Sequence, residues 1–270
     1  MVEIREESTE PSDRGASSST SQRSDGSTPR PTPSSATLSQ FVKEHTMDCV
    51  LFATRIFTIF FALSYILPFT SSNTQQSAYF KAFAAAAATN ALRLQQRIGS
   101  VSFTREFFAR LLLEDSCHYL FYCVLFLTSS PLTMALLPIV LFAALHSSNF
   151  FVTMMNTTGN GGNPLVQRVA TFTSLQTQNC LGIIACSEIF LAPLLFSMIF
   201  MGKASLFTPF VFYRFLTLRY ASRRNPYTRQ AFYQMRVSLD QIAAQPACPT
   251  IVRTFVHKSI SVISNLAPPV

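Results

Sequence analysis

The feature that most constrains the fold is a run of 21 mostly apolar residues, Cys49–Phe69 (CVLFATRIFTIFFALSYILPF). A helix of about 20 apolar residues is long enough to cross the hydrocarbon core of a bilayer. Charged residues make up only 13% of the chain, and apolar residues make up 49%. This composition excludes a disordered chain, a coiled coil and most classes of water-soluble enzyme. We therefore predict an all-α, polytopic membrane protein of transmembrane helices and short helical hairpins.

Three further segments continue this pattern. The alanine-rich residues 78–92 are only weakly hydrophobic, so they form either a weak span that returns beside the first one or a helix at the interface; we favour the span. Residues 111–127 and 132–152 are two apolar runs, and the TSSP sequence between them predicts a tight helical hairpin. The polar Gly/Asn residues 153–167 are expected to form a loop.

The last apolar segments differ in length. Residues 180–201 are long enough for a span, whereas residues 206–218 reach only about 20 Å as a helix. The shorter segment is expected to be a partial or re-entrant element. The chain is thus divided into a disordered Ser/Pro-rich tail (1–40), a multi-span membrane domain (41–218) and a basic cytosolic segment (219–270).

The distribution of charge predicts the topology. Residues 203–270 contain nine Lys and Arg side chains against the single acid Asp240, and residues 93–110 contain four Arg and one Glu. The intervening loops 70–77 and 128–131 carry no charge. Because basic loops stay in the cytosol, both termini are predicted to be cytosolic, with an even number of crossings. This topology leaves the sequon at Asn156 in the cytosol and unglycosylated.

The basic C-terminal segment contains two amphipathic patterns, at 227–245 and 250–266. Such helices lie in the membrane interface, or they form a small cytosolic pair packed on the membrane domain; the sequence leaves both open. The arginines of this segment are predicted to contact anionic headgroups or an acidic partner. They are Arg219, Arg223, Arg224, Arg229 and Arg236.

A few ionisable residues interrupt the apolar runs. Glu114, Asp115 and His118 lie at the start of the third run, and charges at such a depth are costly unless they are paired. They are expected to form hydrogen bonds or ion pairs between helices, with Arg55, Arg93 or Arg97 as candidate partners; an acid–base dyad is the alternative. Glu188 and Arg214 are the only acid and base of their segments, so we predict that they form a buried pair.

The chain carries no motif for chemistry. It has no P-loop, dinucleotide-binding glycines, GxSxG or Cys/His nucleophile arrangement, and no second acid–His pair that would complete a metal site. We expect no catalytic residue, no cofactor and no metal. No recognised nucleic-acid motif accompanies the positive charge, so nucleic acid is not an expected partner.

Four segments resemble the transmembrane protein 33 family, which is also called the Krüppel-homologue-two family and includes a yeast pore-membrane protein. They are LLLEDSCHYLFY (111–122), CSEIFLAP (186–193), FVFYRFLTLRYASRRNPY (210–227) and PACP (246–249). The resemblance extends from about residue 41 to 268. It implies residence in the endoplasmic reticulum and nuclear envelope, association with reticulon-type proteins and the tubular network, a part in nuclear pore distribution, and tuning of the unfolded-protein response.

The resemblance also implies a membrane-binding amphipathic helix near the C-terminus, at 227–245 or 250–266. Descriptions of the family often count three spans with a lumenal N-terminus, which conflicts with the even count above and leaves the number of crossings open. We expect a non-enzymatic protein that organises membrane shape and partners. The rival hypotheses are a transporter, channel or lipid-processing enzyme that uses Glu114, Asp115, His118 and Glu188, and an adaptor for a membrane-bound stress sensor.

Overall fold

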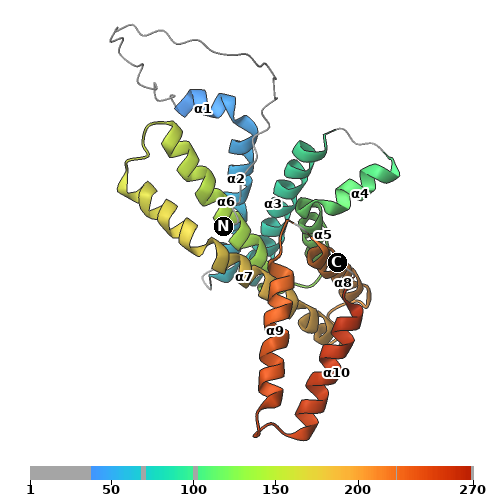
Figure 1. Ribbon diagram of the computed structural model, residues 1–270. Helices are drawn as coiled ribbons and strands as arrows, with labels where there is room; N and C mark the ends of the chain where they lie inside the picture. The colour runs from blue at the N-terminus through green and yellow to red at the C-terminus, as the bar shows by residue number, and fades with distance from the viewer. Residues whose placement is uncertain (1–37, 68–70, 100–102, 223, 269–270) are drawn as a thin grey trace, which may run out of the picture. The chain divides into compact units, whose positions relative to one another are not determined.

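A computed structural model describes residues 38–67, 71–99, 103–222 and 224–268, which belong to one compact unit, Ser35–Val270. All regular elements in these ranges are helical (Figure 1), so the predicted all-α class is confirmed. The predicted tail lies almost entirely outside the described residues. The elements are α1 (Leu38–Glu44), α2 (Thr46–Ile66), α3 (Ser72–Ile98), α4 (Arg105–Leu113), α5 (Asp115–Leu127), η1 (Thr133–Ala135), α6 (Leu136–Thr157), α7 (Pro164–Phe200), α8 (Phe207–Ala221), α9 (Tyr227–Ala244) and α10 (Thr250–Leu266).

Three of these helices are long and apolar enough to cross a membrane: α2, the segment Thr133–Thr157 that contains α6, and α7. The shorter helix α5 is also apolar. Alanine allows α3 to pack closely on α2, since Ala78, Ala82 and Ala86 recur every four residues and are buried. The weakly hydrophobic segment 78–92 is therefore the middle of a longer helix that packs in the bundle.

The core contains a group of aromatic rings that joins α3, α5 and α8. Phe83 of α3 packs on Phe126 of α5, with ring centroids 5.6 Å apart. Tyr122 of α5 packs on Phe215 of α8 at 5.1 Å. Tyr122 also uses its polar end, because its hydroxyl donates a hydrogen bond to the Ala135 carbonyl oxygen, 2.8 Å away. This contact fixes the turn between α5 and α6.

The structure corrects two predicted boundaries. The loop predicted at 153–167 is much shorter, because α6 continues to Thr157 and α7 begins at Pro164. Asn163 caps α7, since its side-chain oxygen accepts a hydrogen bond from Leu165 N at 2.9 Å, and proline is favourable at the first helical position. The segment predicted at 180–201 is thus the second half of a 37-residue helix.

The single apolar run predicted at 111–127 is also broken. Glu114 has an extended backbone (φ −87°, ψ 124°), so α4 ends at Leu113 and α5 begins at Asp115. The two predicted C-terminal helices correspond to α9 and α10, which pack on each other (Figure 1). Arg253 of α10 secures this hairpin, because its Nε donates to the carbonyl oxygen of Ala243 in the last turn of α9, 2.9 Å away.

Candidate functional site: an ionic network at the ends of the short helices

A buried ion pair joins α7 to α8. Arg219 lies in the last turn of α8, and its Nε is 3.3 Å from Oε2 of Glu188 in the middle of α7. Only 1% of the Arg219 side chain and none of the Glu188 side chain is exposed. Opposite charges that are both removed from water need close pairing, because either one alone is costly to bury. The pair therefore fixes the register of α8 against α7.

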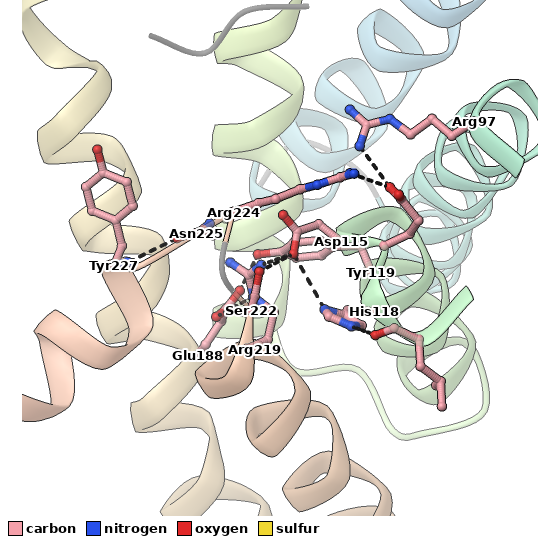
Figure 2. Close-up of polar contacts among 12 residues, drawn as sticks. Arg97, Asp115, His118, Tyr119, Glu188, Arg219, Ser222, Arg224, Asn225 and Tyr227 are labelled. Atoms are coloured by element: carbon pink, nitrogen blue, oxygen red, sulfur yellow. Dashed lines mark hydrogen bonds and ion pairs between the residues drawn. The ribbon is translucent and has the colours of Figure 1, made fainter. Parts of the chain in front are cut away.

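Two side chains of α5 and one that follows α8 surround this pair (Figure 2). Asp115, the first residue of α5, accepts hydrogen bonds through Oδ1 from Arg219 Nη1 at 3.3 Å and from the Ser222 hydroxyl at 3.0 Å. The Tyr119 hydroxyl donates to Glu188 Oε1, and the Arg219 guanidinium lies over the Tyr119 ring, 5.0 Å from its centroid. Asp115 is also well placed at a helix N-terminus, where a negative charge is stabilised. One arginine thus connects three helices.

His118 lies beside this centre and is buried. Its Nε2 is 2.7 Å from the carbonyl oxygen of Leu112. A carbonyl oxygen can only accept, so Nε2 carries the proton and donates this hydrogen bond. The other ring nitrogen, Nδ1, lies 3.6 Å from Asp115 Oδ1. The histidine thereby ties the end of α4 to the first turn of α5.

Glu114 forms an outer layer of the network, between α4 and α5. Its Oε2 lies 2.9 Å from Arg97 Nη1, at the end of α3, and 2.7 Å from Arg224 Nη1, which follows α8. Both arginines are substantially exposed. Arg97 was one of three predicted partners for this acidic cluster, and the structure selects it for Glu114. The outer layer joins the polar ends of α3, α5 and α8.

Glu114→Gln is expected to cause only a small loss of stability. The Glu114 side chain is 13% exposed, but both of its arginine partners reach solvent. Ion pairs that solvent screens contribute roughly 0.2–1 kcal/mol each, so the two pairs together contribute about 1 kcal/mol. Salt screens exposed charges, and the difference from the wild type should shrink as ionic strength rises. Thermal unfolding in detergent at low and high salt measures this effect, with Glu106→Gln on exposed α4 as the control. A loss of several kcal/mol that does not respond to salt would show that Glu114 acts as a buried charge instead.

Two predictions about the arginines are wrong. Arg214 does not pair with Glu188, because it points to the exposed side of α8 while Arg219, five residues later, occupies that position. Arg219 in turn is not available to headgroups, because it is buried within the network. Sequence spacing could not reveal that Arg219, and not Arg214, is the partner of Glu188, since packing decides which side of a short helix faces inward.

The other predicted contact residues have different environments. Arg224 is exposed but bound to Glu114, Arg229 is partly buried, and the side chain of Arg236 is 3.8 Å from Asp240 on the same helix. Arg223 lies outside the described residues. Sequence reasoning missed Tyr119 and Ser222 as network members. Their spacing in the sequence could have revealed both. Tyr119 is four residues after Asp115, and Ser222 is three residues after Arg219, which are the spacings that bring side chains together on one side of a helix.

The network can hold helices together, and its groups already bind one another. Within the described ranges, no group of three or more His, Cys, Asp or Glu side chains could hold a metal ion. Two open surface hollows lie elsewhere, one along Pro164–Leu175 of α7 and one along Thr250–Lys258 of α10. The geometry is that of a structural connection between helices.

The family model for "Transmembrane protein 33/Nucleoporin POM33" matches residues 30–269. The chain belongs to the transmembrane protein 33 family. It is 52% identical over 236 residues to the transmembrane protein 33 homolog of Caenorhabditis elegans, covering 87% of each chain. It is 42% identical over 238 residues to human transmembrane protein 33, covering 88% of this chain and 96% of the human one.

A third relative is Krueppel homolog 2 of Drosophila melanogaster, which is 37% identical over 233 residues, or 86% of this chain and 83% of the relative. No solved structure matches. The predicted family is thus confirmed, and with it the membrane-protein class. The ionic network lies within the region that this family model covers.

Proposed function

We propose that this member of the transmembrane protein 33 family is a non-enzymatic protein of the endoplasmic reticulum and nuclear envelope that helps to shape tubular membrane and to distribute nuclear pores. It would act by inserting short helices and by binding partners such as reticulon-type proteins. The observation that carries this proposal is the length of the helical segments beyond the ionic network. The names of the relatives support the membrane setting, and the family description also names a nucleoporin.

Three segments extend from the network by the same distance. Each segment rises about 18 Å along its helix axis, at 1.5 Å per residue. The segments are Asp115 to Leu127 in α5, Glu188 to Phe200 in α7, and Phe207 to Arg219 in α8. The hydrocarbon core is about 30 Å thick. If the charged layer lies at the cytosolic headgroups, these segments end inside the bilayer. They would then occupy the cytosolic leaflet more than the opposite one.

The turns at the far ends of these segments support an embedded position. The α7–α8 turn carries Phe200, Met201, Leu206 and Phe207 in exposed positions, and Phe200 is 90% exposed. This turn also contacts the turn after α5, because the hydroxyl of Ser130 in that turn donates a hydrogen bond to the Lys203 carbonyl oxygen at 2.9 Å. Large apolar side chains on a turn are unfavourable in water and favourable in lipid. Lys203 can still extend its flexible side chain toward a polar region.

The C-terminal hairpin gives the proposal a second membrane contact. Helix α10 buries only Val256, and its exposed stripe contains Ile251, Phe255, Val262 and Leu266. Lys258 lies on the same face by its helical spacing, and its flexible side chain can extend from this stripe toward the headgroups. This arrangement is typical of a helix that lies in an anionic membrane interface. Asymmetric insertion of short helices and of this stripe on one side would favour a curved membrane.

The pore and partner roles rest on the family alone. Because the chain belongs to this family, we propose that it binds reticulon-type proteins and nuclear pore or import components. On the same ground we propose that it tunes the unfolded-protein response. The cytosolic hairpin of α9 and α10 offers a surface for such partners. The rival proposal, a transporter, channel or lipid-processing enzyme, would need its acids to face a polar cavity; Asp115 and Glu188 instead bind Arg219.

The experiment is reconstitution of the full-length protein into vesicles that contain phosphatidylserine, followed by electron microscopy. We expect the wild type to draw the vesicles into tubules, and Phe255→Asp to reduce the number of tubules several-fold, because a charge in the apolar stripe opposes insertion. Ser264→Asp is the matched control, since Ser264 is exposed on the opposite side of the same helix. Smooth vesicles at every protein density with the wild type would refute the proposal.

A further inference from the structure

Helix α4 is a nine-residue amphipathic helix that lies outside the core. None of its residues is buried, and its main contacts within the described ranges are with α5, the helix that follows it. It is nevertheless well formed. The Thr104 side chain accepts a hydrogen bond from Phe107 N at 3.2 Å, which caps the helix at its start. A helix of this length needs a stabilising surface, because isolated helices shorter than about 12 residues are marginal in water.

One side of α4 is apolar and exposed. Phe108 and Leu112 are four residues apart and lie on one face, and 47% of Phe108 is exposed. Phe103, just before the helix, is 88% exposed, and Leu113 at its end is also exposed. Glu106 and Arg110 lie on the opposite face by their helical spacing. Leu113 shares the side of Glu106 by its spacing, so the apolar side itself is formed by Phe108 and Leu112, with Phe103 before the helix. Exposed large apolar side chains grouped in this way are unusual for a surface that faces water.

The ends of α4 fix its position relative to the ionic network. The extended backbone of Glu114 separates α4 from α5, so the two helices do not form one continuous rod (Figure 1). The Glu114 side chain binds Arg97 at the end of α3 and Arg224 after α8. Helix α4 is therefore held at the level where the polar ends of three helices meet. In a membrane protein with charged groups at its headgroup layer, this is the level of the interface.

We propose that α4 is an interfacial helix that binds an anionic lipid surface, with Phe108 and Leu112 toward the acyl chains and Arg110 on the opposite side toward the phosphates; Arg105, in the first turn beside the apolar face, reaches the phosphates with its long side chain. The charge of the helix favours this occupant, because both arginines are exposed and complement anionic headgroups. The one-residue connection at Glu114 also holds α4 beside α5 and the other helices of the membrane domain. This contact is separate from the α10 stripe and from the short hairpins.

The absence of tryptophan from the chain allows a direct test. Phe108→Trp puts a single indole on the apolar face, and Glu106→Trp puts one on the polar face as the matched control. Each full-length variant is reconstituted into phosphatidylcholine–phosphatidylserine vesicles with lipids brominated near the headgroup end or near the methyl end of the acyl chain. We expect several-fold stronger quenching of Phe108→Trp than of Glu106→Trp, and stronger quenching by the shallow bromines than by the deep ones.

Three results would overturn the proposal. Equal, weak quenching of both variants with water-like emission would place the helix in solution. Blue-shifted emission without quenching at position 108 would mean that protein, such as a second copy of the chain, covers this face. Stronger quenching by the deep bromines would place α4 in the hydrocarbon core. Leu112→Trp, on the same face, replaces Phe108→Trp if that variant does not fold, as judged by its elution profile.

Discussion

Arg219→Met is expected to lower the free energy of unfolding by about 3–5 kcal/mol, the cost found when one partner of a buried ion pair is removed. The substitution keeps an apolar stem of similar length but leaves Glu188, which is completely buried, without its cation. Asp115 loses the same partner. Thermal or denaturant-induced unfolding of the purified protein in detergent would measure the loss.

Arg214→Met is the matched control, because Arg214 lies on the exposed side of the same helix. This variant should remain within about 0.5 kcal/mol of the wild type. Equal stability of the Arg219 and Arg214 variants would contradict the network. A double-mutant cycle gives a sharper result, since Glu188→Gln combined with Arg219→Met should cost less than the sum of the single changes, by about 0.5–3 kcal/mol.

Exchange of the two charges is not expected to rescue folding. A glutamate at position 219 would face Asp115, whose Oδ1 is 3.3 Å from the present guanidinium. Like charges at that distance repel, so the exchanged pair would be stable only if Asp115 were neutralised too. The network is therefore a three-helix arrangement and cannot be treated as an isolated pair.

Phe207→Asp is expected to reduce the amount of membrane-integrated protein several-fold. Phe207 is the first residue of α8, directly after the turn from α7, and is 67% exposed. A charge at the centre of a membrane-spanning helix costs on the order of 2.5–3.5 kcal/mol on insertion scales, and the short aspartate side chain cannot reach a polar layer as lysine does. Cell-free synthesis in the presence of microsomes, followed by carbonate extraction, measures the integrated fraction.

Phe207→Leu is the control for this experiment, because it preserves an apolar side chain at the same position. Its integrated fraction should equal that of the wild type. If Phe207→Asp also integrates normally and remains folded, the turn lies in water, and the segments of α7 and α8 beyond the network do not end inside the bilayer. That result would remove the main support for the asymmetric insertion that we propose.

The helical class and several helices were predictable from the sequence because hydrophobic length and period report directly on local structure. Helix α2 was recognised from its continuous apolar run, and α9 and α10 from an apolar stripe of helical period. Their boundaries agree within a few residues, since prolines lie at or near their ends. Glu114, Asp115, His118 and Glu188 stood out because ionisable groups are rare in apolar runs.

The pairing of these groups was less predictable. Arg214 and Arg219 differ by five residues, or about 500° around a helix axis, so they point to different sides of α8. Only the packing of aromatic residues such as Phe212 and Phe215 against α5 decides which side is buried. The break at Glu114 was missed for a similar reason. The local sequence LLLED favours a continuous helix, and contacts with Arg97 and Arg224, distant in sequence, accompany the break.

The long sequence separations within the network have a consequence for biosynthesis. Asp115 is separated from Arg219 by 104 positions, and Glu114 from Arg224 by 110. While the ribosome is still translating α7, the acids of α5 have already entered the translocation site, but the two arginines do not yet exist. The nascent chain must therefore keep these carboxylates hydrated or shielded until α8 emerges. A transcript truncated before codon 219 would yield a product that quality-control proteases recognise, even though its three longest apolar helices are complete.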